Sequence, residues 1–111
     1  MSNINHIMDQ FIAEGEIDYI ALYLIIDGAR DYFPDFTEKN QMEKTLQFIG
    51  LMIDRGFLAV DLLPDGKCKP WPDQEKSSIL RRIERDWSRD GDEMRVGMEY
   101  WFHWPYPPQP A

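Results

Sequence analysis

The sequence predicts a single α+β domain, in which about four α-helices pack on a small antiparallel β-sheet in the order helix-helix-helix-strand-helix-strand. Apolar residues recur at helical spacing through the first half of the chain and again over residues 73–90. Residues 95–104 alternate between apolar and polar side chains, and the apolar run 57–63 ends in turn residues. A chain of 111 residues is long enough for one core and too short for two. We expect a globular domain over residues 1–104 and a Pro-rich tail, PYPPQPA, over residues 105–111.

The first predicted helix starts after Asn3 or Asn5, either of which can cap it, and ends at Gly15. The longest apolar-rich stretch, Ile17 to Phe33, is predicted to be a second helix at the centre of the helical layer. Pro34 ends that helix because proline disfavours a helical conformation in the residue before it.

A polar line runs along the second predicted helix. Tyr19, Tyr23, Asp27 and Asp31 recur every four residues, so they form one stripe on a helical surface. Tyrosine offers rigid contact area and aspartate pairs with Lys or Arg, a combination typical of protein interfaces. The stripe therefore predicts a partner-binding line, with Asp35 as an extension. The alternative is that the tyrosines pack their rings on a half-buried helix and leave their hydroxyls in water.

Capping and turn signals predict the next three elements. Asp35 and Glu38 have the spacing of a capping box, which predicts a third helix that runs to Arg55 with Gly56 as a left-handed C-cap. Phe57 to Leu63 is predicted to be a strand that stops at the turn Pro64-Asp65-Gly66.

The remaining elements follow a proline-constrained connector over Cys68 to Pro72. A fourth helix is predicted to start at Pro72 or Asp73 and to break at Asp90-Gly91-Asp92. The final predicted strand, Arg95 to Trp104, is expected to pair antiparallel with Phe57 to Leu63. Tyr100 and Phe102 lie on one of its predicted faces, and Trp101 and His103 on the other.

Charge and cysteine content narrow the classes of partner. The 12 basic and 20 acidic side chains give a formal charge of -8, which disfavours nucleic acid and anionic membranes as partners and favours a basic protein. Cys68 is the single cysteine, so no internal disulfide forms and a reducing compartment is expected. The N-terminal residues lack the pattern of a signal peptide, so we expect a cytoplasmic protein.

Few residues fit catalysis. His6 and His103 are the only histidines, and His103 with Glu99 makes two potential ligands where a metal site needs more. Cys68 lies beside Lys67 without a histidine in the same segment, and no familiar catalytic or phosphate-binding motif is present. We therefore predict no enzyme, no catalytic residue, no metal and no cofactor. A small enzyme that uses His103 is the third alternative.

A basic line on the fourth predicted helix offers the main alternative function. Arg81, Arg82, Arg85 and Arg89 could form the recognition helix of a winged-helix-like DNA-binding regulator. Acidic residues such as Glu84 and Asp86 are interspersed among them, which favours a solvated, self-paired helix face.

Three segments carry a resemblance to a known family: RGFLAV with its Pro-Asp-Gly turn, then KPWPDQEKSSILRRIERDW, then EYWFHWP. From Ile17 to Pro105 the chain resembles small bacterial immunity proteins of contact-dependent growth inhibition and other polymorphic toxin systems. The resemblance implies a cytoplasmic protein that binds and neutralises one toxin domain, commonly a nuclease. It implies no particular binding residues, because such proteins vary most where they meet their toxins.

Overall fold

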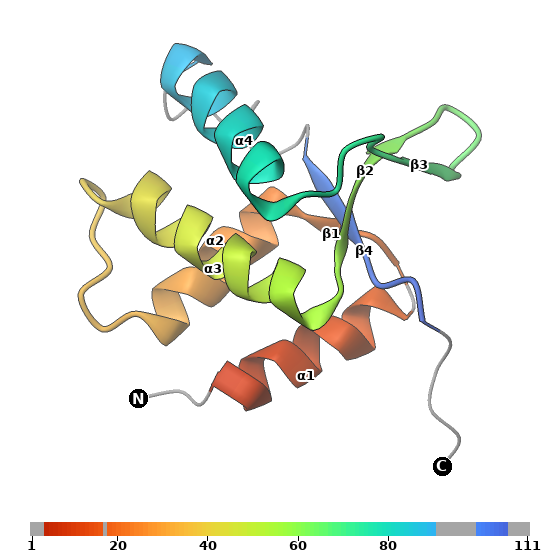
Figure 1. Cartoon of the computed structure of the whole chain (residues 1–111). Coiled ribbons are helices and arrows are strands. Elements are labelled where there is room, and N and C mark those ends of the chain that lie inside the picture. The colour runs from red at the N-terminus through yellow and green to blue at the C-terminus, as the bar shows by residue number, and fades with distance from the viewer. Residues whose placement is uncertain (1–3, 17, 91–99, 107–111) are drawn as a thin grey trace.

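The computed structural model describes residues 4–16, 18–90 and 100–106. Within these residues the α+β prediction is confirmed: four helices pack on an antiparallel sheet (Figure 1). The elements are α1 (Ile4–Gly15), β1 (Ile20–Ala21), α2 (Leu22–Tyr32), α3 (Gln41–Arg55), β2 (Leu58–Leu62), β3 (Cys68–Pro70), α4 (Lys76–Asp90) and β4 (Trp101–His103). Asn3, residues 91–99 and residues 107–111 lie outside the described part, and so do the predictions made for them.

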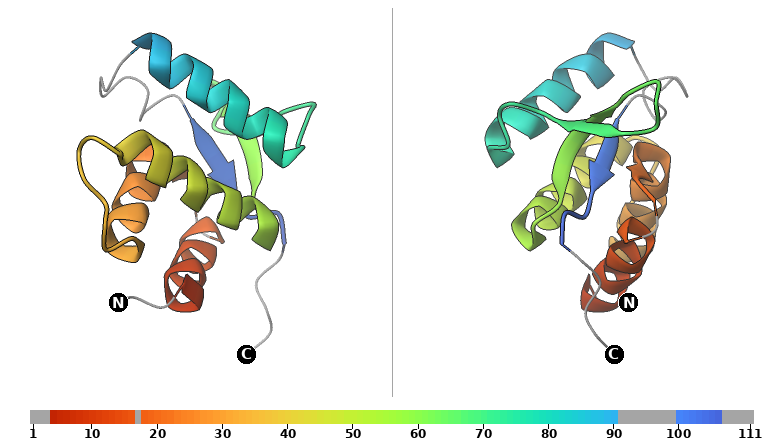
Figure 2. Two further views of the ribbon diagram at one scale, coloured as in Figure 1. Left: turned by 60° about the vertical axis from the view of Figure 1, so that its left-hand side comes forward. Right: turned by 90° about the vertical axis from the view of Figure 1, so that its right-hand side faces the viewer.

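The sheet has the strand order β1-β4-β2-β3, and every neighbouring pair is antiparallel. The predicted pairing of the two long apolar strands is confirmed, with Ala59 of β2 opposite Phe102 of β4. The predicted alternation also holds over the described residues, because Tyr100 and Phe102 are buried while Trp101 and His103 are half-buried. The helices gather on one side of the strands, and the β2–β3 hairpin projects away from them (Figures 1 and 2).

The second helix begins later than predicted. Ile20 and Ala21 form β1, which pairs with β4, and the Leu22 amide donates a hydrogen bond to the Tyr100 carbonyl at 3.0 Å. Without β1 the buried strand β4 would have an unpaired edge, so pairing prevails over helical propensity here. The predicted end is confirmed, since α2 stops at Tyr32 and Phe33 is extended.

The third helix also begins later, because the capping box predicted at Asp35 and Glu38 does not form. A local turn takes its place: the Thr37 amide donates to Asn40 Oδ1 at 2.7 Å, and the Asn40 amide donates to Thr37 Oγ1 at 3.3 Å. The helix starts only at Gln41. Its predicted end is confirmed, with Gly56 in the left-handed region at φ 114°.

The predicted connector contains a strand. Cys68 to Pro70 pairs with β2 as β3, and Pro70 is tolerated because β3 lies at the edge of the sheet. The next helix begins at Lys76 instead of Pro72 or Asp73. Gln74 accounts for this later start. Its side-chain amide makes two hydrogen bonds with the backbone of Ala59, at 3.0 and 2.8 Å, and these hold the segment before α4 against β2.

The core lies between the helices and one face of the sheet. α2 packs against α1 and α3, and α3 packs against α2 and α4, so these two helices lie at the centre of the helical layer, as the sequence predicts for the second helix. Phe48 of α3 and Phe102 of β4 are fully buried, and Phe57 is nearly so. Trp71 is also buried, edge-on to Tyr100 at 5.9 Å between ring centroids, so the segment before α4 packs against the residue that precedes β4.

Candidate partner-binding site

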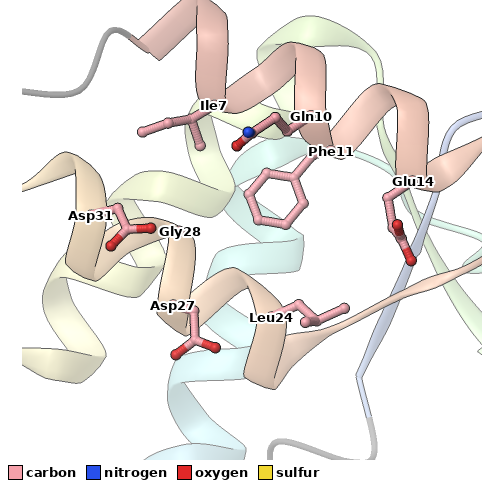
Figure 3. Close-up of a pocket in the computed structure, with 8 residues that line it drawn as sticks. All are labelled: Ile7, Gln10, Phe11, Glu14, Leu24, Asp27, Gly28 and Asp31. Carbon is pink, nitrogen blue, oxygen red and sulfur yellow. The ribbon is translucent and has the colours of Figure 1, made fainter.

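A groove of about 300 Å³ runs between α1 and α2, and we call it the α1–α2 groove. Both helices present residues at the same spacing, which places each set on one helical face. The lining residues are Ile7, Gln10, Phe11 and Glu14 from α1, and Leu24, Asp27, Gly28 and Asp31 from α2 (Figure 3). The groove therefore has an apolar floor with polar and acidic side chains at its rim.

The floor of the groove is tied to the core through Phe11. Its ring meets Phe48 edge-on at 5.7 Å between centroids. Gly28 makes room for the same ring, since a Cβ at this position would lie 2.6 Å from Phe11 Cε2. The close approach of α1 to α2 thus depends on a residue without a side chain.

The rim of the groove is negatively charged. Asp27 is paired with Arg30 at 2.8 Å, and the Arg30 guanidinium also faces the Phe36 ring at 5.3 Å. Glu14 and Asp31 have no ion-pair partner in residues 4–16, 18–90 and 100–106. Two unpaired carboxylates from facing helices therefore border an apolar floor.

The structure keeps part of the predicted stripe together. Asp27 and Asp31 line the groove, and Tyr23 lies one helical turn before Asp27 with 49% of its surface exposed. These three residues lie on the exposed side of α2, as the four-residue spacing predicts. The stripe is shorter than predicted, because Tyr19 precedes β1 and lies outside the helix.

Tyr19 instead packs beside the sheet. Its ring lies 5.4 Å from the His103 ring, centroid to centroid. A hydrogen bond to the Cys68 side chain, together with burial, raises the pKa of Tyr19 above its ordinary value. Tyr19 therefore lies between β1 and the β2–β3 hairpin and is not part of the α1–α2 groove.

Asp35 also lies outside the groove lining. Lys44 Nζ pairs with its carboxylate at 2.9 Å and faces the Phe33 ring at 5.0 Å. The hydrogen bond from Lys44 lowers the pKa of Asp35. Asp35 therefore stabilises the connection between α2 and α3.

Sequence reasoning missed the half of the groove that α1 supplies. Gln10, Phe11 and Glu14 were not predicted as site residues. A signal was present: Gln10 and Glu14 flank Phe11 at the spacing that puts all three on one face. What the sequence does not show is that this face meets α2.

The other candidate residues have local partners. Arg82 of α4 lies over the Trp71 ring at 3.7 Å, and Arg85 pairs with Asp86 at 3.3 Å. Within the described part of the chain, no three His, Cys, Asp or Glu side chains are arranged to hold a metal ion. His103 lies on the sheet beside Tyr19.

Comparisons of the chain with protein-family models, with curated proteins and with solved structures found no match. Among the described helices, none is both long and apolar enough to cross a membrane. The geometry and charge of the α1–α2 groove are therefore the basis for a functional proposal.

Proposed function

We propose that this protein is a cytoplasmic immunity protein that binds a bacterial toxin domain and neutralises it stoichiometrically. The observation that carries the proposal is the α1–α2 groove, where Glu14 and Asp31 border an apolar floor without an ion-pair partner in the part of the chain described. An apolar floor with a charged rim is typical of protein-binding surfaces.

The proposed toxin is a nuclease with a basic active-site cleft. A nuclease binds phosphates with positive charge, so an acidic inhibitor associates rapidly with it and matches its surface. The chain has a formal charge of -8, and the groove concentrates part of that charge. The resemblance to immunity proteins supports the same reading, and such an inhibitor needs no catalytic group of its own.

Tyr23 is the aromatic member of the proposed contact surface. It is a large exposed side chain one turn from Asp27, and rigid rings of this kind often contribute strongly to binding energy. Asp27 is already paired with Arg30, so Glu14 and Asp31 are the carboxylates available to a partner without the loss of an internal ion pair.

A growth experiment tests the proposal. The open reading frame directly upstream would be expressed in bacteria alone, with this protein, and with the variant that combines Glu14→Lys and Asp31→Lys. We expect growth arrest without this protein, full protection with it, and loss of protection with the variant. The two introduced lysines would repel the basic surface of the proposed toxin.

Asp9→Lys combined with Glu38→Lys is the matched control, because it makes the same change in net charge at two exposed residues that do not line the groove. This control should protect as well as the native chain. An upstream product that is harmless, or that stays lethal in the presence of this protein, would count against the immunity function. Protection by the Glu14→Lys, Asp31→Lys variant would remove the groove from the proposal.

A further inference from the structure

We infer that the α1–α2 groove binds the guanidinium group of an arginine side chain presented by the partner. This inference rests on the proposed function and deepens it, because it names the chemical group that the groove recognises. It is carried by three features: the Phe11 ring, the carboxylates of Glu14 and Asp31, and the way this molecule holds its own cations.

The molecule holds two of its own cations by one arrangement. Arg30 pairs with the Asp27 carboxylate at 2.8 Å and lies 5.3 Å from the centroid of the Phe36 ring. Lys44 pairs with Asp35 at 2.9 Å and lies 5.0 Å from the centroid of the Phe33 ring. Each cation therefore contacts a carboxylate and an aromatic ring together, and each contact stabilises the charge.

The groove contains the same pair of groups without the cation. Figure 3 shows the Phe11 ring reaching into the groove, with Asp31 on one side of it and Glu14 on the other. In residues 4–16, 18–90 and 100–106, no Lys or Arg lies over Phe11, and neither carboxylate is ion-paired. A cation supplied from outside would complete the arrangement.

Arginine fits this arrangement better than lysine. A guanidinium is planar, so it can stack on the Phe11 ring while its N–H groups donate to one of the two carboxylates and the other adds to the negative potential of the groove. A lysine ammonium is compact and strongly hydrated, so it gains less from contact with a ring and a carboxylate together. The apolar floor at Ile7 and Leu24 also suits the methylene stem of an arginine side chain.

The test uses the full chain and three small probes: N-acetyl-arginine amide, N-acetyl-lysine amide and N-acetyl-citrulline amide. Citrulline keeps the shape of arginine and lacks its charge. In NMR titrations we expect the arginine probe to shift the Phe11 ring signals and the backbone amides of Glu14 and Asp31, with at least fivefold tighter binding than lysine. Citrulline should cause no saturable shift. Equal binding of citrulline, or of lysine, would overturn the inference.

Three variants sharpen the test. Glu14→Gln combined with Asp31→Asn should reduce binding of the arginine probe at least tenfold, whereas Asp9→Asn, on the same helix outside the groove, should leave it unchanged. Phe11→Leu should lower the affinity for arginine to that for lysine. If Phe11→Leu does not fold, the variant that combines Glu14→Gln and Asp31→Asn decides the question, and unchanged binding of the arginine probe by this variant would overturn the inference.

The probes also separate this inference from the proposed function. Arginine binding by a chain that gives no protection against the upstream product would leave the inference standing and refute the immunity function. Protection by a chain that does not bind the arginine probe would overturn the inference and leave the immunity function standing.

Discussion

At the scale of single residues, helical spacing predicts which side of α2 Gly28 lies on, but it does not predict which residue Gly28 contacts. The helical spacing puts Gly28 on the inward side of α2, where the structure places it. Its role is contact with Phe11, a residue 17 positions away, and no local pattern encodes that contact. Asp27 and Asp31 were likewise predicted from spacing alone, whereas Glu14 required the packing of α1 on α2.

Gly28→Ala should destabilise the protein by about 1–3 kcal/mol, the usual cost of overpacking. The added Cβ would lie 2.6 Å from Phe11 Cε2 and 3.2 Å from Phe48 Cζ, which outweighs the gain in helical propensity. Gly50→Ala is the matched control, because its Cβ would meet nothing closer than 3.7 Å. The control should stabilise by up to about 1 kcal/mol. Urea denaturation measures both, and equal stabilisation would contradict the close packing of Phe11.

At the scale of elements, helix ends were predicted better than helix starts. Gly56 and Pro34 end their helices by backbone restrictions within a few residues, so local sequence suffices. The starts depend on distant partners: β1 forms because β4 lies beside it, and Gln74 holds the segment before α4 against Ala59. The strand at Cys68 to Pro70 was missed for the same reason, since its pairing partner decides its conformation.

The segment that leads into α4 should confer a pH dependence on stability. Asp73 accepts a hydrogen bond from the Glu75 amide at 2.9 Å and another from the Ser78 side chain, and these lower its pKa below the ordinary value of 3.8. A lowered carboxyl pKa stabilises the folded state above the unfolded-state pKa, and this contribution is lost as pH falls through the folded-state pKa. The pKa of Asp35 is also lowered, by its hydrogen bond from Lys44, so its contribution to stability is likewise lost as the pH falls.

Asp73→Ala should therefore be less stable than the native chain near pH 6, with a difference that shrinks steadily as the pH falls below 3.8. Urea denaturation midpoints between about pH 2.5 and pH 6.5 give the measurement. Asp9→Ala, at an exposed position of α1, is the comparison, because the Asp9 carboxylate accepts no hydrogen bond within the part of the chain that the structure describes. A constant difference for Asp73→Ala across this range would show that the carboxylate charge makes no contribution.

At the scale of the whole molecule, the charge distribution separates the proposed inhibitor from a DNA-binding regulator. A regulator using α4 needs basic side chains free for phosphates, yet Arg82 stacks on Trp71 and Arg85 pairs with Asp86. With a formal charge of -8, the chain should pass through a heparin or duplex-DNA column at about 0.1 M salt. Retention that weakens steeply with added salt would favour the regulator.

If the protein is the proposed inhibitor, its rate of association with the upstream product should depend on the salt concentration and on the charge beside the groove. Screening shortens the Debye length from about 10 Å at 0.1 M salt to about 3 Å at 1 M, so the rate constant should fall at least tenfold over this range. Arg30→Gln removes the cation that pairs with Asp27 and should raise the rate constant about twofold at low salt, because the groove gains negative potential. Arg81→Gln makes the same charge change on the exposed surface of α4, and should alter the rate less than Arg30→Gln does. Stopped-flow measurements on the native chain and the two variants give the rate constants. Equal effects of the two substitutions would mean that the net charge of the chain, and not the charge of the α1–α2 groove, accelerates association.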